Sequence, residues 1–164
     1  MDYRHVKTMT DENGIIQFSV NGVPDISSGY TVDDNARALL VALSMEEEDR
    51  KKYALTYTRF LYSAQREDGT WCNWKIGQKF IPDIDSEDSI GRAFLACSVA
   101  AQCDIEEVHR LSMEMVMKAL PNLNKLSFPR SVAYGLVGIS FGINVLPGYR
   151  AYVELVAKEY CQSL

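Results

Sequence analysis

The sequence repeats itself at an interval of 55 residues, and this repeat constrains the fold more than any other feature. Asn13-Gly14 recurs as Asp68-Gly69, and the Asp33…Arg37 spacing recurs as Asp88…Arg92, both 55 residues later. Two separate motifs that share one offset are hard to obtain by accident in a chain of 164 residues. A weaker third copy spans residues 133–138. Repeats of this kind indicate stacked helical units that bury a common core.

Each copy predicts a helix rich in small and apolar residues, followed by a more amphipathic helix. Thr31 with Asp34 three residues later, and Ser86 before an acidic first turn, are typical helix start signals. Helices that are apolar almost all round have to be covered on most sides, so the first helix of each pair is expected inside. The sequence therefore predicts an all-α fold of about three inner/outer hairpins, at residues 32–45 and 49–65, 87–101 and 104–120, and 130–143 and 148–161.

Composition narrows the class of protein. The length fits one domain over residues 1–164. The net charge of -5 and the scattered basic residues do not favour a nucleic-acid partner. No apolar stretch is long enough to predict a membrane span. The four cysteines form no CxxC pair, so we expect reduced thiols in a cytoplasmic protein with no metal site and no cofactor.

Several motifs resemble those of a known structural family. Residues 65–71 carry a Gln-x-x-Asp-Gly-x-Trp turn that is similar to turns of α/α toroids, which include six-hairpin glycosidases and terpene cyclases. Three runs resemble a bacterial helical domain fused to glycosyltransferases or encoded beside carbohydrate enzymes: 28–39 (SGYTVDDNARAL), 86–93 (SEDSIGRA) and 129–134 (PRSVAY). The resemblance covers roughly residues 5–145. It implies an (α/α) toroid-like fold with a sugar-related role, of which this chain would supply about half the ring.

Acidic residues gather at the predicted starts of the inner helices. If these starts open onto one hollow, their carboxylates converge. Glycoside hydrolysis needs one protonated and one ionised carboxyl group, about 5–5.5 Å or about 6.5–9.5 Å apart. Close like charges also raise the pKa of one member of such a pair. The candidate catalytic residues are Asp34, Glu87, Asp33 and Asp88.

Neighbouring side chains could bind a sugar. The candidate substrate-binding residues are Tyr30, Arg37, Trp71, Trp74, Asp85 and Arg92. Each of these residues also has a purely structural interpretation. Carboxylates in a first helical turn also satisfy free N–H groups, and the Asp33/Arg37 and Asp88/Arg92 spacings allow ion pairs along the helix. The two tryptophans could equally anchor a hairpin between helices.

The favoured function is therefore a carbohydrate-active or carbohydrate-binding domain, with glycoside hydrolysis by a carboxylate pair as the catalytic form. The alternatives are a non-catalytic interaction module or a truncated relic of a larger glycosyltransferase-type or glycosidase-type protein. Beside a carbohydrate ligand, the expected partner is a second copy in a homodimer or a complementary chain that completes the ring.

Overall fold

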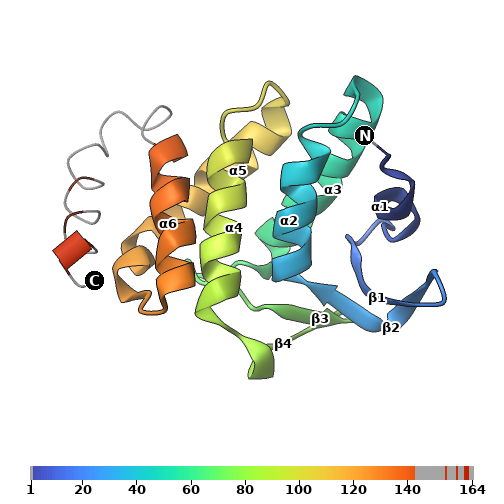
Figure 1. Cartoon of the computed structure of the whole chain (residues 1–164), viewed down its shortest axis with the longest axis horizontal. Coiled ribbons are helices and arrows are strands. Elements are labelled where there is room, and N and C mark those ends of the chain that lie inside the picture. Colours follow the sequence, from blue (N-terminus) through green and yellow to red (C-terminus); the bar gives the residue numbers. More distant parts are fainter. Residues whose placement is uncertain (1, 143–153, 155–157, 159–160, 163–164) are drawn as a thin grey trace.

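Figure 1 shows the computed structural model of the chain, which describes residues 2–142, 154, 158 and 161–162. The helices are α1 (Arg4–Thr8), α2 (Val32–Ala42), α3 (Glu47–Ala64), α4 (Glu87–Ala100), α5 (Glu106–Ala119) and α6 (Pro129–Gly142). The strands are β1 (Ile16–Val20), β2 (Val23–Thr31), β3 (Trp74–Ile76) and β4 (Lys79–Ile81), and two 3-10 turns are η1 (Pro82–Ile84) and η2 (Leu120–Lys125).

The long helices form two layers. Helices α2, α4 and α6 lie side by side, with α3 and α5 behind them, and all three front helices begin at the end that carries β3 and β4 (Figure 1). The five helices predicted within residues 32–143 occur within a few residues of their expected positions. The predicted helix over 148–161 lies largely outside the described residues.

The all-α prediction is wrong, and with it the α/α toroid and the half-ring interpretation, because the chain also contains a four-stranded antiparallel sheet in the order β1-β2-β3-β4. Its first hairpin turns at Asn21 and Gly22, whose φ angles are 52° and 80°. This backbone is the one that a two-residue β-hairpin turn needs, and Asn-Gly is the dipeptide that adopts it most readily. The segment before α2 is therefore a hairpin and not a loop of a helical ring.

The second hairpin, β3–β4, lies in the long connection between α3 and α4, and Gly77 in its turn has a φ of 56°. Strand β2 pairs with β3 through Tyr30↔Lys75 and Thr31↔Trp74. Thr31 is also the N-cap of α2: its side-chain oxygen accepts from the Asp34 N–H at 3.1 Å. Ser86 caps α4 in the same way through the Ser89 N–H. Both predicted caps are confirmed, and the sheet fixes where α2 begins.

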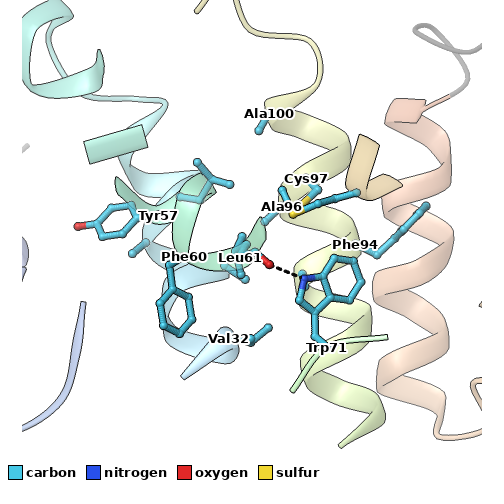
Figure 2. Packing of buried hydrophobic residues seen from close by; sticks show 14 of the residues in the cluster. Val32, Tyr57, Phe60, Leu61, Trp71, Phe94, Ala96, Cys97 and Ala100 are labelled. Carbon is cyan, nitrogen blue, oxygen red and sulfur yellow. Dashed lines mark hydrogen bonds between the residues drawn. The ribbon is translucent and has the colours of Figure 1, made fainter. Parts of the chain in front are cut away.

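Trp71 anchors the α3–α4 connection in the core. Its side chain is 0% exposed, and its indole N–H donates to the Leu61 carbonyl at 3.0 Å (Figure 2). Phe94 from α4 and Val32 from α2 belong to the same buried cluster. A buried indole needs a partner for its N–H, and the carbonyl of the preceding helix provides one.

Apolar side chains also reach the surface on the β1–β2 hairpin, where Phe18, Val20, Val23 and Ile26 are all at least 60% exposed. No helix in the described part of the chain is both long enough and apolar enough to span a bilayer.

Two glycines allow α4 and α6 to approach closely. A Cβ atom on Gly91 would lie 2.8 Å from the Ser131 carbonyl oxygen, and one on Gly138 would lie 2.7 Å from the Phe94 ring. Contacts this short do not occur between real Cβ atoms and backbone, so a side chain at Gly91 would push the helices apart. By contrast, a Cβ on Gly135 of α6 meets only ordinary contacts at 3.6 Å and beyond.

We therefore predict that Gly91→Ala lowers the free energy of unfolding by about 1–3 kcal/mol, as overpacking does elsewhere. Gly135→Ala is the control: it should be neutral or stabilise by up to about 1 kcal/mol, because alanine favours a helix. Urea unfolding of both variants checks this. Equal stabilities of the two variants would contradict the close approach of the helices.

Candidate functional site

The starts of α2, α4 and α6 surround a cleft of about 900 Å³. Asp33 comes from the first turn of α2, and Phe128 and Arg130 come from the start of α6. The remaining lining is supplied by the start of α4 and the turn before it: Asp85, Ser86, Glu87, Asp88 and Arg92, with Pro129 completing the rim. The structure thus brings together acidic residues that lie up to 55 positions apart in the sequence.

Arg92 joins the helices at the centre of this cleft. Its Nε lies 3.2 Å from Asp33 Oδ1, and its Nη1 donates to Asp33 Oδ2 at 3.4 Å. Its Nη2 lies 4.0 Å from Asp88 Oδ2 on its own helix. The guanidinium also stacks over the Tyr134 ring of α6, 5.1 Å from the ring centre. The nearer carboxylate partner of Arg92 therefore belongs to α2 and not to the i,i+4 position that the sequence suggested.

Asp88 is held ionised by groups from α6. It forms an ion pair with Arg130, and Ser131 donates its hydroxyl to Asp88 Oδ1 at 2.7 Å. The Arg130 contact is the main cause that lowers the pKa of Asp88, and the Ser131 hydroxyl lowers it further. A carboxylate that accepts charge-assisted hydrogen bonds keeps its negative charge at lower pH.

The pKa of Asp33 moves the opposite way. Burial raises it, and this effect exceeds the lowering caused by Arg92 and by Arg37, whose Nη2 lies 3.6 Å from Asp33 Oδ2. Burial opposes ionisation because the charged form loses water. Two carboxyl groups that share one guanidinium thus have pKa values displaced in opposite directions.

The other two candidate acids are held by neighbouring groups. Asp34 Oδ2 accepts from the Thr31 hydroxyl at 2.7 Å, and Asp34 Oδ1 pairs with Arg37 at 2.6 Å. Glu87 accepts hydrogen bonds from the backbone N–H groups of Ser127 and Phe128 at 2.6 and 3.0 Å. These bonds lower the pKa of Glu87 against the opposing effect of burial. Glu87 therefore fixes the chain just before α6 begins.

The candidate binding residues are distributed around and behind the cleft. Tyr30 is buried and donates to Asp11 at 2.6 Å, and Trp71 lies in the core. Trp74 is half-buried on β3, where its indole N–H donates to the Ser28 carbonyl. Asp85 lines the cleft, accepts from the Asn73 N–H and pairs with Arg66. Arg37 lies on α2 beside both of its aspartates.

Sequence reasoning missed Arg130, Phe128 and Tyr134. The repeat contained a signal for two of them: the third copy lies 42 residues after the second, which aligns Arg130 with Asp88 and Tyr134 with Arg92. Arg130 and Tyr134 do not match the Asp…Arg pattern of the first two copies. Only their position in the third copy therefore indicates that they belong to the site. Phe128 had no such signal.

Comparisons of the chain with protein-family models, curated proteins and solved structures found no match. Among the described residues, no group of three or more His, Cys, Asp or Glu side chains could hold a metal ion.

Substitution of Glu87 tests whether its hydrogen bonds to the chain before α6 stabilise the protein. We predict that Glu87→Ala lowers the free energy of unfolding by about 0.5–2 kcal/mol, as loss of a helix cap does. Glu48→Ala, on the exposed first turn of α3, is the control and should change it by less than about 0.5 kcal/mol.

The pH dependence follows from the lowered pKa of Glu87. Its stabilisation is present above the unfolded pKa and is lost as pH falls through the folded pKa. Urea unfolding at pH 7 and pH 3 should therefore show a smaller difference between wild type and Glu87→Ala at pH 3. A difference that is the same at both pH values would exclude a role for the ionised carboxylate.

Proposed function

We propose that the cleft hydrolyses a glycosidic bond, with Asp33 as the general acid and Asp88 as the ionised partner. The observation that carries this proposal is that Asp33 and Asp88, from two different helices, line one cleft and contact one guanidinium. Their environments displace the two pKa values in opposite directions, which supports it. Pairs of carboxyl groups whose environments separate their pKa values in this way are the basis of acid/base assignment in glycosidases.

In this proposal Asp33 and Asp88 have different catalytic roles. Asp33, whose pKa is raised by burial, is assigned as the acid that gives a proton to the leaving glycosidic oxygen. Asp88, paired with Arg130, stays ionised and acts on the anomeric carbon, directly or through a water molecule. The C–O bond breaks as the proton reaches the leaving oxygen. If Asp88 attacks directly, water then displaces it from the anomeric carbon and gives its proton to Asp33. If Asp88 acts through water, that water gives its hydroxyl to the anomeric carbon and its proton to Asp88, and solvent returns a proton to Asp33.

Arg92 keeps both carboxyl groups in one place. Its side chain is 15% exposed, and its guanidinium contacts Asp33, Asp88 and the Tyr134 ring. Its positive charge also helps to lower the pKa of Asp88. Arg92 is therefore a positioning residue of the proposed site.

The cysteines support a proposed cytoplasmic location. All four are free, and Cys72 and Cys97 are buried. Burial raises the pKa of the Cys97 thiol, which makes it unreactive. Free thiols of this kind are usual in a reducing compartment.

We predict that Asp33→Asn and Asp88→Asn each lower kcat/KM for hydrolysis by about 10²–10⁴-fold, because each removes one member of an acid/base pair. Asp83→Asn, at an exposed position of η1 outside the cleft lining, is the control and should leave the rate unchanged. A panel of unsubstituted disaccharides, with reducing sugar measured over time, checks this prediction.

The pH profile separates the two roles. In the wild type, kcat/KM should rise as Asp88 ionises and fall as Asp33 loses its proton at higher pH. Asp33→Asn should remove the fall on the alkaline side. Wild-type activity in both variants, or no saccharide hydrolysed by the wild type, would overturn the proposed function.

A further inference from the structure

Phe128 presents an aromatic ring to a cleft whose lining includes six charged side chains. It is 64% exposed, and of the large exposed apolar side chains in the described residues it is the one that lines this cleft. Phe128 shares this lining with Arg130, Asp33 and Asp88. An aromatic ring in water is unfavourable, and a ligand that covers it recovers that free energy.

The backbone under Phe128 is fixed from two sides. Its N–H donates to Glu87 Oε2 at 3.0 Å, and the preceding residue, Ser127, donates both its N–H and its hydroxyl to the same carboxylate. Phe128 also precedes Pro129, which restricts the conformations of the residue before it. The ring is therefore attached to a rigid base, and ordering it on binding costs little entropy.

The charged neighbours limit what can cover the ring. A lipid chain or an apolar peptide would remove water from Asp33, Asp88 and Arg130 without replacing its hydrogen bonds, which is unfavourable. A sugar ring offers C–H groups on one face and hydroxyl groups at its edge, so it can cover Phe128 while its hydroxyls replace water around the charged groups. Pyranoses in which every hydroxyl is equatorial have the least interrupted C–H faces.

We infer that Phe128 is the stacking platform of the cleft and that the substrate class is gluco-configured pyranosides. This inference rests on the proposed function and names its substrate class. It also gives Glu87 a positioning role: this carboxylate, which the sequence suggested as catalytic, holds the backbone of Phe128 in place.

The test is titration of the ¹⁵N-labelled protein with cellobiose, maltose and β-1,4-mannobiose, followed by NMR. Mannobiose is matched to cellobiose except for the axial hydroxyl at C2 of each of its two rings. We expect cellobiose or maltose to bind more tightly than mannobiose and to shift the signals of residues 127–131. Phe128→Ala should weaken that binding about tenfold, whereas Phe128→Trp should retain it. The control is Phe18→Ala, which removes an exposed phenylalanine on the β1–β2 hairpin and should bind as the wild type does.

The possible outcomes distinguish a failure of the Phe128 platform from a failure of the proposed glycoside hydrolysis. Suppose that Phe128→Ala binds all three sugars as the wild type does, while Asp33→Asn and Asp88→Asn abolish hydrolysis. The role of Phe128 as a stacking platform is then wrong, whereas the proposed catalytic pair of Asp33 and Asp88 is supported. Equal or tighter binding of mannobiose would overturn the substrate class. If none of the three sugars binds to the wild type, the inference fails outright. Thermal unfolding of Phe128→Ala confirms that the variant is folded.

Discussion

The contact of Arg92 with Asp33 is the interaction on which the cleft depends. It links α4 to α2, while stacking of the same guanidinium on Tyr134 links α4 to α6. Asp88 and Arg130 add a second connection between α4 and α6. A largely buried cation needs compensating charge, because removing one partner of such a pair leaves the other uncompensated. The three helix starts are therefore held together by electrostatics as well as by the apolar core beneath them.

The repeat explains why these residues meet. Asp33, Asp88 and Arg130 occupy one position of the three copies, and Arg37, Arg92 and Tyr134 occupy the position one helical turn later. Stacking the copies side by side places each pair next to the following one, so contacts form between copies as well as within them. Gly91 makes this possible, because any side chain there would meet the backbone of α6.

The helices could be predicted from the sequence because their signals are local. Thr31 and Ser86 cap α2 and α4 as expected, and the apolar periodicity places the helix bodies. The sheet was missed although Asn21-Gly22 is a strong hairpin signal, since the helical repeat and the family resemblance outweighed it. Pairing of β2 with β3 joins residues more than 40 positions apart, and no local pattern encodes such a pairing.

The site was predictable in part. The repeat indicated that acidic residues would gather at helix starts, but it could not tell which carboxylates are engaged by neighbours. Glu87 binds backbone N–H groups of Ser127 and Phe128, forty residues along the chain, and Asp34 is shared between Thr31 and Arg37. Among the carboxylates of the described residues, only Asp33 and Asp88 combine a place in the cleft with contact to Arg92. This selection depends on tertiary contacts.

The most direct test of this arrangement is a ¹³C NMR titration of the side-chain carboxyl groups of Asp33 and Asp88 in the intact protein. Asp33 should titrate above the ordinary aspartate pKa of 3.8 because it is buried, and Asp88 below it because of Arg130. Titration of both groups together near 3.8 would contradict the account, because the two carboxyl groups would then lack the separated pKa values that the proposed acid/base pair requires.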